Sequence, residues 1–163
     1  MGDSGAGLEA LEVLYRTGFS SFVRAAGAIA GEAAARDVVQ EAFAQAVKKR
    51  SSFKHEAPLE AWVWRIVINQ ALELRRRRTA DLRWEADPGL DPSANGFPGG
   101  DAAIRSWIGA LPERQRLAVF LRYFADLDYR SIAAALEVEV GTVSATLATA
   151  HAALRRSYTE VVP

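Results

Sequence analysis

The sequence predicts an all-α protein with two small helical domains joined by a linker. Alanine, the strongest helix former, supplies 31 of the 163 residues, and turn residues are confined to a few places. Half of the residues from Asp87 to Gly100 are proline or glycine, so no helix continues through this stretch. The share of hydrophobic residues is 50% and that of charged residues 25%, which is typical of a folded chain and excludes a disordered or collagen-like one.

The first domain is predicted at residues 8–83, after a disordered tail at residues 1–7. Two short amphipathic helices are expected between Leu8 and Gly31, with Gly18 as the break between them. A third helix carries its apolar residues on one face, which leaves a polar face free. These apolar residues are Val38, Val39, Ala42, Phe43, Ala46 and Val47.

A fourth helix follows a break at residues 51–58. Its apolar stripe consists of Leu59, Trp62, Val63, Ile66, Val67 and Leu74. The other side carries a polar row whose members, spaced by four and three residues, share one helix face: Arg65, Asn69, Glu73 and Arg76. Trp62 lies on the stripe and is expected in the core, whereas Trp64 lies off the stripe and is expected to be exposed.

The linker is predicted at residues 84–100, and the second domain at residues 101–158 with a C-terminal tail at residues 159–163. Small and acidic residues fill the linker between its prolines and glycines. Such a segment cannot bury enough apolar surface to offset the entropy lost on ordering. We therefore expect a flexible acidic connection between two separate helical units.

The second domain has the pattern of a helix-turn-helix. A helix begins at Leu111-Pro112, a short helix of small residues follows at residues 128–136, and Gly141-Thr142-Val143 opens the last helix. The last helix keeps one apolar stripe, which consists of Val143, Leu147, Ala150 and Leu154. Because the small residues let another helix pack steeply across them, the last helix is expected to project outward.

The net charge of zero conceals a basic middle segment. Residues 43–83 carry ten basic and four acidic residues, whereas residues 1–42 carry three basic and six acidic ones. The four consecutive arginines, Arg75 to Arg78, give this segment a local field suited to phosphates. The alternative is a solvated helix end, since arginine also favours the negative pole of a helix dipole.

Several classes of function are excluded by what the sequence lacks. It has no cysteine and two distant histidines, His55 and His151, so no disulfide, metal site or thiol nucleophile is expected. No phosphate-binding glycine loop or Ser/His/Asp arrangement supports an enzyme, and no cofactor is expected. No apolar run is long enough to cross a bilayer and the N-terminus lacks an export signal, which predicts a cytoplasmic protein with no membrane partner.

Two stretches of the chain resemble the extracytoplasmic-function group of RNA polymerase sigma factors. The first resembles sigma region 2 and consists of RDVVQEAF at residues 36–43, Phe53, WVWRIVIN at residues 62–69, Glu73 and Arg76. Within it, Val63, Val67 and Glu73 replace the usual Leu, Ala and Asp and preserve their character. The second stretch, residues 111–156, resembles sigma region 4. The two stretches come in the order of the family, with a linker between them.

This resemblance implies an alternative sigma factor, which recruits core RNA polymerase to promoters and stabilises the melted minus-ten element. The implied partners are the clamp helices and flap of core RNA polymerase, promoter DNA as duplex and as single non-template strand, and an anti-sigma factor or activator. The residues implied for binding the polymerase clamp are Asp37, Gln40 and Glu41. The residues implied for binding minus-ten DNA are Phe53, Lys54, His55, Trp64, Arg65, Asn69, Arg75, Arg76, Arg77 and Arg78. Trp64 or Phe53 is the expected stacking surface for a base.

The sequence departs from the family in the helix that reads duplex DNA. Residues 144–151 contain no lysine or arginine, whereas family members carry basic residues there. Because phosphate neutralisation supplies most of the sequence-independent affinity for duplex DNA, we expect weak contact with the minus-thirty-five element. The residues expected to make this contact are Arg130, Thr142, Ser144, Thr146, Thr149 and Arg155.

Two alternative functions remain open. A sigma-like mimic would bind an anti-sigma factor or polymerase without reading DNA, and the neutral face of the last helix favours it. An autonomous helix-turn-helix regulator would read DNA mainly through that helix, and its lack of cations argues against this function. Asn69 and the arginine run favour a sigma factor over a mimic, because a mimic has no need to bind single-stranded DNA.

Overall fold

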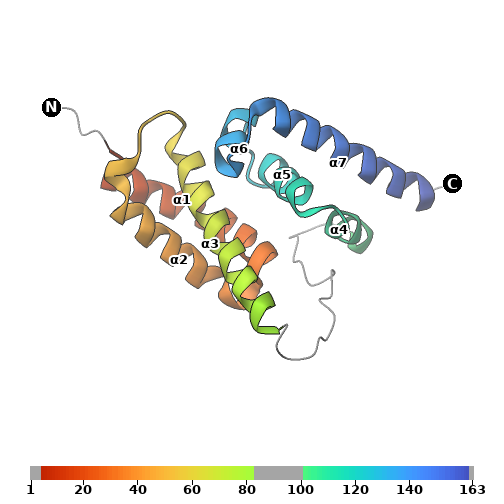
Figure 1. Ribbon diagram of the computed structural model, residues 1–163, viewed down its shortest axis with the longest axis horizontal. Coiled ribbons are helices and arrows are strands. Elements are labelled where there is room, and N and C mark those ends of the chain that lie inside the picture. The colour runs from red at the N-terminus through yellow and green to blue at the C-terminus, as the bar shows by residue number, and fades with distance from the viewer. Residues whose placement is uncertain (1–4, 83–100, 162–163) are drawn as a thin grey trace.

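The computed structural model describes residues 5–82 and 101–161, and the predicted linker lies outside the described residues. This part of the chain contains only helices, which confirms the all-α prediction. The first domain consists of α1 (Leu8–Ala30), α2 (Glu32–Lys48), the short 3-10 helix η1 (Arg50–Ser52) and α3 (Leu59–Leu82). The second consists of α4 (Ala102–Gly109), α5 (Glu113–Tyr123), α6 (Tyr129–Leu136) and α7 (Val140–Val161). The two domains lie against each other, with α6 next to α3 (Figure 1).

The helix α1 is continuous, so the predicted break at Gly18 is wrong. The ring of Phe22 lies against Gly18, with its Cε2 atom 2.7 Å from where a Cβ would stand. Phe22 is buried, and its ring centroid lies 4.4 Å from that of Trp64 and 5.3 Å from that of Phe43. Burial of this ring offsets the roughly 1 kcal/mol that glycine costs inside a helix. The chain turns instead at Gly31, whose φ of 92° glycine readily adopts.

The chain is already packed just before α1, within the segment for which the sequence predicts a disordered tail. Ala6 is buried, and its N–H donates to the carbonyl oxygen of Arg50 over 2.9 Å. A Cβ on Gly5 would stand 2.5 Å from the same oxygen, so the close approach requires glycine. The start of α1 is thereby attached to η1, immediately before the loop that leads into α3.

The helix α3 is buried on more than the single stripe that the sequence predicts. Val63 and Val67 are fully buried as expected, but Trp64 and Ile68 are buried as well. Trp64 packs on Phe22 of α1, while Ile68 lines a small cavity between α1, α3 and α5. Because the rest of the first domain covers one side of α3 and the second domain covers another, its sequence does not show a simple amphipathic pattern.

The second domain has the geometry of a helix-turn-helix, because α6 and α7 meet at 99°. The carboxylate of Asp128 caps α6 by accepting a hydrogen bond from the backbone N–H of Ser131 over 2.7 Å. This hydrogen bond lowers the pKa of Asp128. On α7 the buried residues of the predicted stripe are Val143, Leu147 and Ala150. The helix continues to Val161.

Neither a metal-ligand cluster nor a single membrane-spanning helix occurs in residues 5–82 and 101–161. No three His, Cys, Asp or Glu side chains in these ranges are placed to hold a metal ion. Taken together, α6 and α7 have the length and composition of a membrane-spanning segment, but the two helices are bent by 99° at their junction.

Candidate nucleic-acid interface

The polar row of α3 lines a groove between α3, the end of α2, η1 and α6. All four members of the predicted row contribute, namely Arg65, Asn69, Glu73 and Arg76. The other polar residues that line the groove are Gln45, Lys49, Ser52, Gln70 and Glu137. The groove measures about 460 Å³, which falls within the size range of small-ligand sites. The side chain of Asn69 is exposed, so its amide can both donate to and accept from a ligand.

Two of the four consecutive arginines are strongly exposed: Arg76 lines this groove, and Arg77 lines a hollow between α2 and α3. Arg76 Nη1 and Arg77 Nε lie 3.3 Å and 3.2 Å from the two carboxylate oxygens of Glu73. Their side chains remain 77% and 73% exposed. Ion pairs this exposed contribute little, so both guanidinium groups can exchange Glu73 for a phosphate at small cost.

The other two arginines have structural partners elsewhere. Arg78 donates to the carbonyl oxygen of Ala30 over 2.8 Å and so satisfies the C-terminal end of α1. Arg75 pairs with Glu113 at the start of α5. Burial at this domain boundary lowers the pKa of Arg75, and the nearby guanidinium of Arg116 lowers it further. In the structure the four guanidinium groups therefore do not form one cluster, although they are consecutive in the sequence.

The accessible aromatic surface of the site is Trp62. Trp64 is 1% exposed and Phe53 is 5% exposed, so the prediction that either ring offers a face to a base is wrong. Trp62 is half-buried, lines the groove, and has its ring centroid 5.4 Å from that of Phe53. The exposure of the two tryptophans is therefore the reverse of the prediction. Because α3 is covered from two sides, Trp64 is buried and Trp62 lies at the edge of the core.

The loop between η1 and α3 adds a basic residue to the same wall. Lys54 is exposed, and it lines a second hollow beside the groove together with Arg65 and with Ala134 of α6. His55 is exposed as well, has a φ of 58°, and its ring centroid lies 4.5 Å from that of Phe53. His55 therefore covers Phe53, while Lys54 is the loop residue placed beside the polar row.

The acidic face predicted on α2 is exposed. Asp37, Gln40 and Glu41 all face solvent. Asp37 and Glu41 line a shallow groove between α2 and α3, whose other wall includes Glu73 and Arg77. On the buried face of the same helix lie Val38, Val39, Ala42 and Phe43, as predicted. This surface lies on the side of α2 that remains free of the core.

The exposed face of α7 is polar and uncharged over its first turns. Thr142, Ser144 and Thr149 are exposed, and Thr146 is half-buried. The hydroxyl of Thr149 donates to the carbonyl oxygen of Ala145 over 2.9 Å. Arg155 is exposed two turns further along. The cations that usually hold duplex DNA are therefore replaced by hydroxyl groups.

Arg130 is not grouped with the face of α7. It lies in the first turn of α6 and lines a hollow together with Phe53 and His55 of the first domain. The sequence groups Arg130 with the duplex-reading residues because of its position in the helix-turn-helix. In the structure this guanidinium faces the loop of the first domain.

An aromatic and imidazole pair beside α7 was missed by reasoning from the sequence. The hydroxyl of Tyr123 lies 2.8 Å from Nε2 of His151, and Tyr123 is 58% exposed. Nearby, the guanidinium of Arg122 lies 5.9 Å from the centroid of the Tyr129 ring. No local sequence signal marks this pair, because Tyr123 and His151 come from different helices.

Two family models match the chain in consecutive segments. Residues 18–80 match Sigma-70 region 2, and residues 101–154 match Sigma-70 region 4. The first segment includes the polar row of α3, and the second includes α6 and most of α7.

Curated relatives include two sigma factors. The chain is 31% identical over 144 residues to the RNA polymerase sigma-H factor of Pseudomonas aeruginosa, an alignment that covers 76% of this chain and 72% of the relative. It is 30% identical over 137 residues to the ECF RNA polymerase sigma-E factor of Escherichia coli, with 72% and 70% covered.

Solved structures share the fold at lower sequence identity. CnrH, solved in complex with the cytosolic domain of CnrY, has a TM-score of 0.70 at 23% identity and covers 99% of this chain and 94% of its own. The sigma factor RpoE of Bartonella quintana, solved with the anti-sigma factor NepR, has a TM-score of 0.72 at 19% identity, with 93% and 98% covered.

Proposed function

Because this chain belongs to the extracytoplasmic-function family of RNA polymerase sigma factors, we propose that it holds core RNA polymerase through α2 and the melted minus-ten DNA through α3. In this role it is an alternative initiation factor, and polymerase itself carries out the chemistry. The observation that carries the proposal is the groove of α3, where an amide, a guanidinium and an indole come together at Asn69, Arg65 and Trp62.

The groove offers what an unpaired base requires. Removing a base from the duplex costs a few kcal/mol, and stacking it on an aromatic side chain returns about 1–3 kcal/mol. Trp62 offers the stacking surface, and Asn69 offers a donor and an acceptor for a base edge. Arg76, in this groove, and Lys54, in the adjoining hollow, are proposed to contact the phosphates of the same strand.

The exposed acidic face of α2 is suited to a basic helical partner. Carboxylates form strong charge-assisted hydrogen bonds with arginine, and Asp37 and Glu41 lie one helical turn apart on the same exposed face. Gln40, between them in the sequence, adds a neutral donor and acceptor. We assign this face to the clamp helices of core RNA polymerase, and the second domain to the flap and the minus-thirty-five duplex.

Contact with duplex DNA is the weak part of this assignment. The start of α7 can meet a phosphate through its backbone N–H groups, and Arg155 adds one cation on the exposed side of the helix. Without basic residues in its first turns, α7 neutralises few phosphates, so affinity for duplex is low and depends little on salt. Promoter recognition then rests mainly on the minus-ten element.

The neutral face of α7 also supports a second candidate, a sigma-like mimic. Such a protein would bind polymerase or an anti-sigma factor and would not need a site for single-stranded DNA. Both solved relatives described above are complexes, and the RpoE complex contains an anti-sigma factor. The polar groove of α3 favours the initiation factor, because a mimic would have no use for it.

Transcription in vitro distinguishes the two candidates. Purified core RNA polymerase, with and without this chain, is given a library of genomic promoter fragments, and run-off transcripts are sequenced. An initiation factor produces new, chain-dependent start sites, whereas a mimic produces none although it binds polymerase.

Matched variants then assign the two surfaces. Asn69→Ala is expected to lower the yield of open complexes while leaving polymerase binding nearly intact. Asp37→Lys is expected to weaken polymerase binding by about tenfold. Glu9→Lys, which makes the same charge change at an exposed position of α1, is the control. Equal loss of both activities in Asn69→Ala would contradict the assignment of the groove.

A further inference from the structure

The pair formed by Tyr123 and His151 lies beside the same face of α7 as Ser144 and Arg155, which we assign to duplex DNA. Ser144, Ala148, His151 and Arg155 follow one another at spacings of four, three and four residues, so they share one face of the helix. Ser144, Ala148 and Arg155 are exposed, and His151 is half-buried. On this face Arg155 carries a fixed positive charge, and His151 is the side chain whose charge depends on pH.

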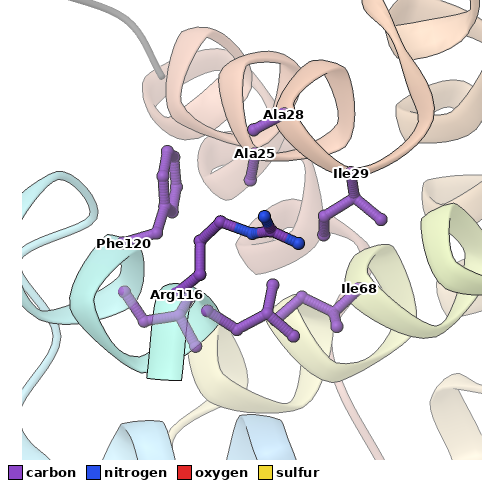
Figure 2. Close-up of a pocket in the computed structure, with 8 residues that line it drawn as sticks. Ala25, Ala28, Ile29, Ile68, Arg116 and Phe120 are labelled. Carbon is purple, nitrogen blue, oxygen red and sulfur yellow. The ribbon is translucent and has the colours of Figure 1, made fainter. Parts of the chain in front are cut away.

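The hydrogen-bond partner of His151 comes from a different helix, α5. Figure 2 shows Arg116 and Phe120 of α5 at the cavity between α1, α3 and α5. Tyr123 lies past these residues, at the C-terminal end of α5, and is 58% exposed. Its hydroxyl oxygen lies 2.8 Å from Nε2 of His151, and the two ring centroids are 5.7 Å apart. A phenol and an imidazole are therefore held together at the surface beside α7.

Protonation of His151 fixes the direction of this hydrogen bond. While the imidazole is neutral, either group can be the donor, because Nε2 carries the hydrogen in one tautomer and accepts in the other. In the imidazolium, Nε2–H donates to the tyrosine oxygen, and the hydroxyl hydrogen of Tyr123 is directed elsewhere. The protonated pair therefore offers a positive charge and a free hydroxyl donor, and both groups bind phosphate oxygens.

Charged groups of both signs lie on the elements that pack against α7. They are Arg122 at the end of α5, Asp126 and Asp128 in the following turn, Arg130 at the start of α6, Glu137 and Glu139 before α7, and Arg155 and Arg156 on α7 itself, with Tyr123 and Tyr129 as titratable neutral groups.

These groups leave the imidazole of His151 to Tyr123. The guanidinium of Arg122 donates to the carbonyl oxygen of Leu127, and the carboxylate of Asp128 caps α6. The two glutamates precede His151 by about three helical turns or more. The helix α4 contacts α7 about two turns beyond His151, at Tyr158. Within residues 5–82 and 101–161, His151 forms no ion pair with a carboxylate, so its charge is available to a ligand.

We propose that Tyr123 and protonated His151 form a phosphate-binding site beside the duplex-reading face of α7, so that protonation strengthens the contact of the chain with duplex DNA. The inference rests on the proposed function, since it adds a proton-dependent contact to the face assigned to the minus-thirty-five duplex. The phosphate oxygen accepts a hydrogen bond from the hydroxyl of Tyr123 and lies beside the imidazolium. The site replaces part of the positive charge that residues 144–151 lack.

Proton binding and duplex binding are then coupled with a fixed sign. Because the duplex favours the protonated imidazole, its affinity rises as the pH falls through the range in which histidine takes up a proton. By reciprocity, formation of the complex takes up protons from solution. One further neutralised phosphate also steepens the dependence of log affinity on log salt concentration by about 0.9.

Binding of the full chain to a short mixed-sequence DNA duplex, followed by fluorescence anisotropy at pH 8 and pH 5.5, tests the site. For the parent chain we expect the dissociation constant to fall about fivefold at the lower pH, and the salt slope measured between roughly 50 and 200 mM to steepen by about 0.9. In His151→Gln both quantities are expected to stay at their pH 8 values. The chain's other histidine, His55, is present in both proteins, so the difference between them belongs to His151.

Two further variants separate the charge from the hydroxyl. His151→Arg is positive at both pH values and is expected to bind the duplex tightly and with the steeper slope at each. Tyr123→Phe keeps the ring and removes the hydroxyl, so the gain at the lower pH is expected to shrink to about twofold. If His151→Gln does not fold, His151→Arg still decides the matter, because a fivefold gain at low pH in this variant would contradict the site.

Three outcomes overturn the proposal: an equal gain at low pH in the parent and in His151→Gln, a salt slope in the parent that is the same at both pH values, or no binding of the duplex at either pH. None of these measurements uses polymerase. A failure of the proposed function would appear separately, as the absence of chain-dependent start sites in transcription while the pH response of duplex binding is intact.

Discussion

Trp62 is supported along one edge and open on the other, which suits an aromatic platform. Its ring packs beside Phe53 while the remainder faces the polar groove. Replacing the indole by a smaller apolar side chain, Trp62→Leu, keeps the contact with Phe53 but removes the stacking surface. We expect affinity for single-stranded DNA, measured by fluorescence anisotropy, to fall about tenfold.

Trp62→Leu is expected to lower the affinity for DNA without lowering the stability of the fold. The midpoint of urea unfolding serves as the control and is expected to move little, because the ring is only half-buried. Unchanged affinity with an intact fold would remove Trp62 from the site.

Trp64 shows the opposite behaviour, because its whole ring is enclosed. The indole nitrogen is buried and has no hydrogen-bond partner among the described residues. Trp64→Ala is therefore expected to lower the free energy of unfolding by about 3–5 kcal/mol. Trp64→Phe keeps most of the apolar contact with Phe22 and also removes the unsatisfied N–H, so a loss of only about 1–2 kcal/mol is expected.

Urea unfolding measures both Trp64 variants. A Phe variant as unstable as the Ala variant would show that the indole nitrogen has a partner or that the ring edge is essential to packing.

At the scale of the helix, the cap of α6 gives the helix-turn-helix a defined pH response. The hydrogen bond from Ser131 holds the pKa of Asp128 below its ordinary value of 3.8. The stabilisation by this carboxylate is therefore complete above the unfolded-state pKa and is lost as the pH falls through the lower, folded-state pKa. Asp128→Ala is expected to cost about 1 kcal/mol at pH 7 and progressively less on acidification.

Asp128→Asn provides the matched control, because asparagine keeps the capping acceptor and does not titrate. Thermal unfolding of the three proteins between pH 7 and pH 2.5 measures the differences. A gap between the parent and Asp128→Ala that grows at low pH would reverse the sign and contradict this account.

The buried residues of a helix that is covered on one side could be predicted from the sequence, whereas those of a helix covered on two sides could not. The buried residues of α7 follow the predicted stripe because α7 packs against the body on a single face. The pattern of α3 fails because α1, α2, α5 and α6 all contact it, so Trp64 and Ile68 are buried off the stripe. Helix propensity wrongly predicted a break at Gly18 for a related reason, because the ring of Phe22 packs against this glycine within a continuous helix.

The candidate site was predictable as far as it follows helix periodicity. The polar row of α3 and the acidic face of α2 depend only on spacing along one helix, and both lie as expected. The partners of Arg75 and Arg78 depend on which helices come together, and no spacing along the chain contains that information. The same holds for Tyr123 and His151.

At the scale of the whole molecule, contact between the domains couples their local stability. Ile68 is 2% exposed and belongs to the first domain, yet it lines the cavity together with Leu117 and Leu121 of α5. Ile68→Ala removes apolar contact with α5 while leaving the ion pairs of Arg65 and Arg75 with the second domain in place. Each 1.4 kcal/mol lost from this contact raises about tenfold the fraction of molecules in which the two domains are separated.

Hydrogen exchange followed by mass spectrometry reads this coupling segment by segment. In Ile68→Ala, peptides covering α5 are expected to exchange about tenfold faster than in the parent, although the substitution lies in the other domain. Peptides from α7 beyond Ala150 report on the far side of the second domain and are expected to change much less. Unaltered exchange in α5 would mean that the two domains gain no stability from each other. In that case the contact between the domains would rest on the ion pairs of Arg65 and Arg75, and high salt would be expected to weaken it.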